Sequence, residues 1–168
     1  MERRRTLSVK QKLILLLFPL CILLLDQFTK KFVMNSMFLG ESKKIIGNIV
    51  RFTYIRNPNS VFGLHIGGPL ISTILTGVAF IFVIYLFTTG KHRLFLTGIS
   101  FIIGGALGNL ADRFFYMEVV DFVDIGIKEY RWPTFNVADS FVTIGIILVI
   151  IYYWVTEVRY ANSTSNSV

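Results

Sequence analysis

Cysteine, histidine and charge are scarce in this chain of 168 residues. It has one cysteine, two histidines and 16% charged residues, whereas a soluble domain has about 25%. The single thiol, Cys21, excludes an internal disulfide and a multi-cysteine metal site, and two histidines are too few for a histidine-rich zinc site. A hydrophobic content of 54% argues against a disordered tail and an ordinary soluble enzyme. An integral membrane protein is the class that remains.

Four apolar segments are long enough to cross a bilayer, which takes about 20 mainly apolar residues in a helix. We expect these helices over residues 13–34, 70–88, 94–114 and 137–155. The first segment follows basic residues, as in a signal peptide, but no small-residue cleavage site comes after its apolar run. We therefore interpret it as a retained signal anchor.

The placement of lysine and arginine predicts the orientation. Five basic residues precede the first segment, and Lys91 and Arg93 occupy the short link between the second and the third. With four spans, both termini and this link lie on one side, which we expect to be the cytoplasm. The outer loops are then residues 35–69 and 115–136, although the first of them is also basic.

One stretch of the first outer loop, residues 49–55, is rich in the Val, Ile, Phe, Thr and Tyr typical of strands. We therefore predict an all-α membrane protein with four transmembrane helices and a small extracytoplasmic β element on that loop. Residues 1–160 are expected to form a single four-span domain. Residues 161–168 are expected to form a polar C-terminal tail, disordered over 162–167.

The polar residues of the spans and outer loops gather on one side of the membrane. Ionisable groups inside spans are costly and mark functional sites. In the expected topology they lie at the outer ends of the spans, which predicts one site at the membrane boundary. The residues concerned are Asp26, Lys30, Asn57, Asn109, Asp112, Arg113, Asp121, Asp124, Asn136 and Asp139.

Several of these residues also have structural interpretations. Asp26 and Lys30 are four residues apart, so they could neutralise each other on one helix. Asp112 and Arg113 could form an ion pair at the lipid headgroups. A GxxxG motif that begins at residue 104 would let two helices pack closely. Each of these structural interpretations is an alternative to a role of the same residues in the predicted site.

Carboxyl groups are the most abundant chemical resource of the expected site. Asp121 has apolar neighbours on both sides, which should raise its pKa. Asn136 could cap the fourth span, and Asp139 could complete a capping box. Two carboxyl groups that share a proton can activate water, one as general base and one as general acid. The alternatives are a metal-dependent hydrolase that also uses Asp124, a Ser–Lys peptidase that pairs Ser60 with Lys30 or Lys31, and a proton or ion transporter.

Five motif blocks follow one another along the chain. They are Asp26-Gln27-Phe28-Thr29-Lys30, Arg56-Asn57, GGALGNLADR from Gly104 to Arg113, Val120-Asp121-Phe122 and Phe135-Asn136-Val137-Ala138-Asp139. In this order and at these spacings they resemble the lipoprotein signal peptidases (signal peptidase II).

The resemblance implies an aspartic endopeptidase of the bacterial cytoplasmic (inner) membrane, with its active site at the outer leaflet. Such enzymes remove the signal peptide from a diacylglyceryl-modified prolipoprotein and cut before the lipidated cysteine. The implied partners are prolipoproteins and membrane lipids, with no nucleic acid, metal or cofactor, and a monomer is expected. The resemblance implies Asp121 and Asp139 as the catalytic pair, with Asp26, Lys30, Asn57, Asn109, Arg113 and Asn136 binding substrate or supporting the pair.

One block departs from the family pattern N-x-G-A-A-[FW]. Here Asn59 replaces the glycine, and Ser60 and Val61 replace the two small alanines. Asparagine tolerates a positive φ, so we expect the turn to be kept. The bulkier pair bears on the fit of substrate or inhibitor. In the second outer loop, Trp132-Pro133 is expected to be a gate over the site or an interfacial anchor.

Overall fold

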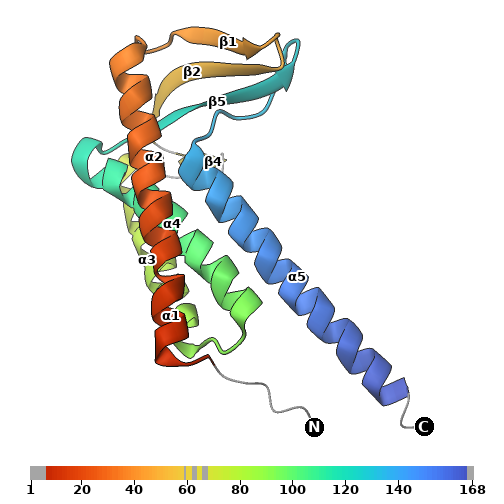
Figure 1. The fold of residues 1–168 in the computed structure, drawn as a ribbon. Helices are drawn as coiled ribbons and strands as arrows, with labels where there is room; N and C mark the ends of the chain where they lie inside the picture. Colours follow the sequence, from red (N-terminus) through yellow and green to blue (C-terminus); the bar gives the residue numbers. More distant parts are fainter. Residues whose placement is uncertain (1–6, 59, 62–63, 66–67, 166–168) are drawn as a thin grey trace.

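The computed structural model describes residues 7–58, 60–61, 64–65 and 68–165 (Figure 1). The helices form one end of the molecule, and a small sheet lies across the other end. The helices are α1 (Val9–Leu15), α2 (Leu17–Ser36), α3 (Gly68–Thr89), α4 (Arg93–Tyr116) and α5 (Val137–Ser165). The strands are β1 (Ser42–Ile46), β2 (Val50–Asn57), β3 (Ser60–Val61), β4 (Leu64–His65), β5 (Val119–Ile127) and β6 (Tyr130–Arg131).

The first span is divided into α1 and α2 at Leu16. Pro19 explains the break, because proline has no N–H and its ring clashes with the carbonyl four residues earlier. The Leu16 N–H instead donates to the carbonyl of Leu13 at 3.1 Å. A capping box between Ser8 and Gln11 starts the span. The span therefore begins a few residues earlier than the sequence predicts.

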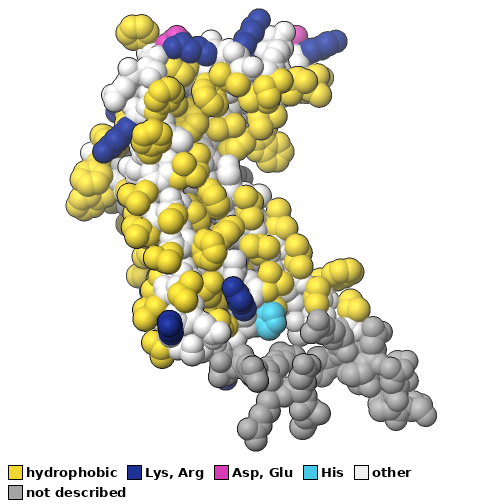
Figure 2. Space-filling view, viewed as in Figure 1, with side chains coloured by type: hydrophobic (Ala, Val, Ile, Leu, Met, Phe, Trp, Pro, Cys, Tyr) yellow, Lys and Arg dark blue, Asp and Glu magenta, His cyan; other side chains and the backbone are white. Residues whose placement is uncertain are grey.

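Among the described residues, four helical stretches are long and apolar enough to cross a membrane. They are Val9–Ser36, Gly68–Thr89, Arg93–Tyr116 and Val137–Thr156, which confirms the four predicted helices. Apolar side chains cover this part of the surface, and lysine and arginine lie towards its two ends (Figure 2). The helix α5 continues to Ser165, so residues 162–165 are helical, where we expected disorder. The domain boundary at residue 160 stays a prediction.

The central helix of the bundle is α4, which contacts α2, α3 and α5. Its glycines make the close approaches possible: a Cβ at Gly104 would lie 2.8 Å from the Cβ of Ile22 on α2. At Gly108 a Cβ would lie 2.5 Å from the Oδ2 of Asp26, also on α2. The GxxxG motif is therefore the α2 contact of α4, as its packing interpretation requires.

The main sheet has four antiparallel strands in the order β1-β2-β5-β6. The predicted strand at residues 49–55 is confirmed over residues 50–55, which belong to β2, but β5 comes from the second connecting loop. The all-α description and the β element on the first loop are therefore incomplete, because the sheet takes strands from both connecting loops. The first residues of β5 are buried on both faces, so their sequence shows no alternation of apolar and polar residues.

The register of the sheet positions the site. Asp121 on β5 pairs with Ile55 on β2, and Val119 pairs with Asn57. One face of these strands packs on α2, where Tyr54, Val120 and Phe122 join its apolar side chains in one cluster. Asp121 alternates with Val120 and Phe122 along β5, so its side chain points away from that cluster.

Candidate active site

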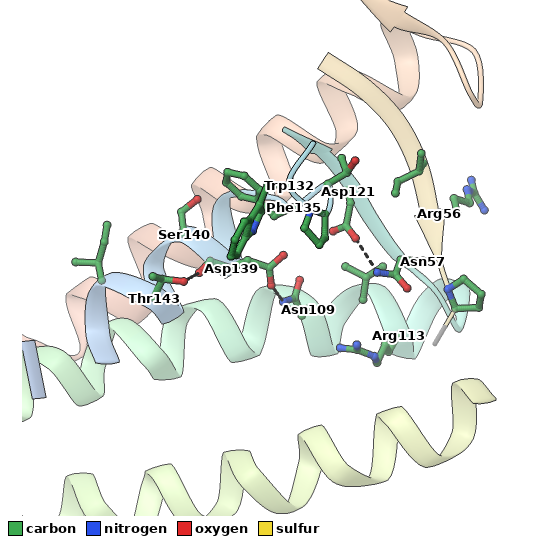
Figure 3. Close-up of a pocket in the computed structure, with 16 residues that line it drawn as sticks. Arg56, Asn57, Asn109, Arg113, Asp121, Trp132, Phe135, Asp139, Ser140 and Thr143 are labelled. Atoms are coloured by element: carbon green, nitrogen blue, oxygen red, sulfur yellow. Dashed lines mark hydrogen bonds between the residues drawn. The ribbon is translucent and has the colours of Figure 1, made fainter. Parts of the chain in front are cut away.

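A pocket of about 980 Å³ lies between the sheet and the adjoining ends of α4 and α5 (Figure 3). Most of its wall is apolar, and a few polar groups face into it. Its lining residues are Ile55, Arg56, Asn57, Pro58, Asn109, Arg113, Val119, Asp121, Trp132, Pro133, Thr134, Phe135, Asp139, Ser140, Thr143 and Ile144. An apolar pocket with a few convergent polar groups is the usual form of a binding or active site.

Asp121 reaches the pocket from β5 and is only 2% exposed. Its Oδ1 accepts a hydrogen bond from Asn136 Nδ2 at 2.7 Å, and its Oδ2 accepts one from Asn57 Nδ2 at 3.0 Å. Burial, and then the charge of Asp139, raise the pKa of Asp121 to about 7. The prediction of a raised pKa from the apolar neighbours is therefore confirmed, and the group can hold a proton near neutral pH.

Asp139 reaches the same pocket from the first turn of α5 (Figure 3). Its Oδ1 accepts from Asn109 Nδ2 at 2.8 Å, and its Oδ2 accepts from the Asn136 backbone N–H at 3.3 Å. The Oδ1 of Asn136 in turn accepts from the Asp139 N–H at 2.9 Å. The predicted capping box is thus present, and its carboxylate also lines the pocket.

Asn136 connects the two aspartates directly. It is fully buried, and its Nδ2 donates both to Asp121 and to the Oδ1 of Asn109, which lies 3.0 Å away. The Oδ1 of Asn136 accepts a hydrogen bond from the Asp139 N–H. The structure therefore brings Asn57, Asn109 and Asn136 around the two aspartates, as the motif blocks imply.

Asp26 and Lys30 lie behind the pocket and do not line it. Lys30 Nζ is 2.7 Å from Asp26 Oδ2 and 2.9 Å from Asp112 Oδ2, and the three side chains are at most 1% exposed. Asp112 is buried with Lys30 between α4 and α2 and not exposed at the headgroups, so the interpretation of Asp112 and Arg113 as an exposed headgroup pair does not hold. Gln27, for which no role was predicted, also joins these side chains: its Nε2 donates to Asp112 Oδ1 at 2.8 Å.

Two arginines lie at the pocket. Arg113 lines it from α4 and is 5% exposed. Arg56 lies nearer the solvent, where its Nε donates to the Tyr54 hydroxyl at 3.0 Å and its guanidinium lies 5.6 Å from the Tyr116 ring centroid. Both can offer donors to carbonyl or phosphate oxygens, because a guanidinium donates in a fixed fork.

The geometry bears on two of the alternative chemistries. Asp124 does not line the pocket, because its carboxylate binds Arg131 and Thr53 elsewhere on the sheet. In the part of the chain that the structure describes, no three His, Cys, Asp or Glu side chains gather as metal ligands. The ammonium of Lys30 is held by two carboxylates, which disfavours it as the base of a Ser–Lys pair.

Asn57 and Pro58, which precede the departure from the family pattern, line the pocket. The side chains of Ser60 and Val61 lie outside the described residues, as do Asn59 and Phe62. Trp132 is 71% exposed and lines the pocket together with Pro133. Both interpretations of Trp132, as a gate and as an interfacial anchor, remain compatible with this position.

Comparisons with known proteins show the family of the chain. Among curated relatives, the lipoprotein signal peptidase of Syntrophus aciditrophicus is 38% identical over 85% of this chain and 94% of its own length. That of Anoxybacillus flavithermus is 41% identical over 84% and 85%. A solved bacterial membrane enzyme superposes with a TM-score of 0.75 at 31% identity, covering 89% of this chain and 91% of its own. The family model for signal peptidase (SPase) II matches residues 18–155, and the chain belongs to this family.

Proposed function

We propose that this chain is a lipoprotein signal peptidase that removes the signal peptide from diacylglyceryl-modified prolipoproteins and cuts before the lipidated cysteine. The observation that carries the proposal is the meeting of Asp121 and Asp139 in one pocket at the ends of membrane-crossing helices, within a chain of the signal peptidase II family. An aspartic peptidase needs two carboxyl groups that share a proton around one water.

The surroundings divide the acid and base roles between the two aspartates. Asp139 lies at the positive end of α5, where the helix N-terminus and two N–H donors stabilise a carboxylate. Asp121 lies in a strand and not in a helical turn, and its burial favours the neutral form. In the resting pair the proton therefore belongs mainly to Asp121.

The reaction follows from this division. Asp139 accepts a proton from water while the water oxygen bonds to the scissile carbonyl carbon, and Asp121 gives its proton to the carbonyl oxygen. The tetrahedral diol then collapses: Asp139 protonates the amide nitrogen of the cysteine, Asp121 takes a hydroxyl proton back, and the C–N bond breaks. The pair returns to its starting state, and one water is consumed.

The supporting residues fix the pair and the substrate. Asn57, Asn109 and Asn136 hold the two carboxyl groups, and Arg113 faces the pocket beside them. The pocket wall continues along α5 through Thr143 and Ile144, both exposed on a membrane-crossing helix. A substrate that carries two acyl chains can therefore keep them in lipid while its peptide bond reaches the aspartates.

The orientation completes the proposal. The start of α1 and the end of α5 lie at the same end of the molecule, opposite the sheet (Figure 1). The basic residues before the first span and in the link of Lys91 and Arg93 support a cytoplasmic location for that end. The pocket then lies at the outer leaflet of the bacterial cytoplasmic membrane, with the sheet against the lipid surface. The chain acts as a monomer.

The test is cleavage of a diacylglyceryl-modified prolipoprotein by the purified protein in detergent with EDTA. We expect wild type to cut, and Asp121→Asn and Asp139→Asn to lose at least about 10³-fold in kcat, as when a group that acts directly in catalysis is removed. Asp124→Asn is the matched control and should keep its activity. Full processing by Asp121→Asn, or loss of wild-type activity in EDTA alone, would contradict the proposed chemistry.

A further inference from the structure

A cluster of three buried charges lies behind the two aspartates. The Lys30 cluster consists of Lys30, Asp26 and Asp112. The Lys30 Nζ lies 2.7 Å from Asp26 Oδ2 and 2.9 Å from Asp112 Oδ2, and the three side chains are at most 1% exposed. None of the three lines the pocket. Burying three charges costs more than a packed apolar core of the same volume would. The connections of the cluster to its surroundings indicate what it does.

Each carboxylate of the cluster holds the backbone N–H of the residue just before one of the aspartates. Asp26 Oδ1 accepts from Ala138 N at 2.8 Å, one residue before Asp139. Asp112 Oδ2 accepts from Val120 N at 3.0 Å, one residue before Asp121. The same ammonium binds both carboxylates, so α5 and β5 are tied to one charge at these two positions.

The ammonium also orients the amides that contact the pair. Lys30 Nζ donates to Asn109 Oδ1 at 3.1 Å, and because an ammonium only donates, that atom must be the amide oxygen. The Asn109 NH₂ group then faces Asp139 at 2.8 Å. The same Asn109 oxygen accepts from Asn136 Nδ2, which donates to Asp121. The charge of Lys30 therefore fixes the direction of the hydrogen bond from Asn109 to Asp139 and of the one from Asn136 to Asp121.

We propose that the Lys30 cluster is a positioning device that sets the separation of Asp121 and Asp139 and the sharing of their proton. This inference rests on the proposed function of the site. The cluster touches neither water nor substrate in the pocket and takes no part in bond making. Its effect on rate comes from geometry, because a displacement of about 1 Å at a reacting group can cost about 10²-fold in rate. Its effect on the shared proton comes from the charge of Lys30, which acts on Asp121.

The charges that face Asp121 set the direction of the expected effect. They are Lys30 from α2, Arg113 from α4 and Asp139 from α5. Arg56 from β2 lines the same pocket. Asp112→Asn keeps a side-chain oxygen that can accept from the Val120 N–H. It removes one of the two negative charges that neutralise the Lys30 ammonium. The pKa of Asp121 should then fall, so its proton should be lost at a lower pH than in wild type.

The experiment compares Asp112→Asn with Asp124→Asn in the full-length protein in detergent. Asp124 is a matched control, because it is a buried carboxylate on β5 that pairs with Arg131 away from the pocket. We expect Asp112→Asn to lower kcat about 10- to 100-fold with KM within about twofold. Asp124→Asn should lower the unfolding temperature comparably and keep the wild-type kcat.

A second readout follows the proton itself. The infrared C=O band of the protonated Asp121 carboxyl, identified by its absence from Asp121→Asn, should titrate at a lower pH in Asp112→Asn and at the wild-type pH in Asp124→Asn. If Asp112→Asn does not fold, Gln27→Met removes the neutral donor to Asp112 and should give a smaller fall in kcat at unchanged KM.

The outcomes separate this inference from the proposed function. Equal kcat and equal band midpoints in Asp112→Asn and Asp124→Asn would overturn the positioning role and leave the cluster structural. A wild-type protein that cuts no prolipoprotein, but whose band shifts as expected in Asp112→Asn, would overturn the proposed function and keep the positioning role. A kcat that falls only with the folded fraction also counts against positioning.

Discussion

At the scale of single residues, two aspartates of the same chemistry differ through what surrounds them. Asp139 shares the N-terminal turn of α5 with its capping partner Asn136. Asp121 is 2% exposed in a strand, with its pKa raised to about 7 first by burial and then by the charge of Asp139. The asymmetry gives a pair with one proton near neutral pH, which is what acid–base cleavage of an amide requires.

The raised pKa predicts the basic limb of the pH profile. The proposed acid, Asp121, is protonated below its pKa and loses its proton as the pH rises through about 7, so kcat/KM should fall above that pH. The Asn57 amide lowers this pKa by donating to the carboxylate. In Asn57→Ala the limb should therefore move to higher pH. Initial rates between pH 5 and 9 for both proteins check this.

Two results would contradict that prediction. A wild-type kcat/KM that stays constant from pH 6 to 9, with the fold intact by circular dichroism, would remove Asp121 as the acid. A limb that moves to lower pH in Asn57→Ala would contradict the role of the Asn57 hydrogen bond.

At the scale of elements, the site depends on how closely α4 approaches its neighbours. Gly108 lies against the Asp26 carboxylate of α2, and Gly105 lies against Ala138 of α5. Because α4 has no side chain at these two positions, the Asp26 carboxylate and the Ala138 backbone can lie directly against it. The pocket is therefore built by backbone contact as much as by the polar side chains.

A pair of glycine substitutions tests this dependence. In Gly108→Ala the new Cβ would lie 2.5 Å from Asp26 Oδ2, which should cost about 1–3 kcal/mol of stability and lower kcat. Gly77→Ala on α3 is the control, because no atom lies within 4 Å of its Cβ and alanine favours helix by roughly 0.5–1 kcal/mol. Unfolding temperatures and kcat measured in one detergent compare them. Equal behaviour of the two variants would show that close approach at Gly108 is unimportant.

At the scale of the whole molecule, the proposed function requires the sheet to face outward. The single native cysteine, Cys21, makes this measurable, since Cys21→Ser gives a cysteine-free background. Lys44 on β1 and Lys91 in the α3–α4 link are both exposed. In intact cells, a membrane-impermeant maleimide should label Lys44→Cys and should label Lys91→Cys only after lysis. The reverse pattern would invert the orientation.

The sequence predicts the helices and most of the site because both depend on local signals. The spans follow from the length of the apolar runs, and Asp121, Asp139 and their asparagines follow from motif blocks. The strand β5 was not predicted, because its first residues are buried on both faces and show no alternation of apolar and polar residues. The proposed role of Asp112 was not predicted, because its carboxylate accepts a hydrogen bond from the backbone N–H of Val120. Almost every residue has such an N–H, so the sequence does not mark the partner.

The wall of the pocket along α5 has a consequence for turnover. Thr143 and Ile144 belong both to the pocket and to the exposed surface of a membrane-crossing helix. Enzyme and substrate then meet by lateral diffusion in two dimensions, and the encounter rate depends on substrate molecules per lipid, not per litre. Adding substrate-free lipid to fused vesicles would slow cleavage by surface dilution, whereas changing the bulk volume would leave the rate unchanged.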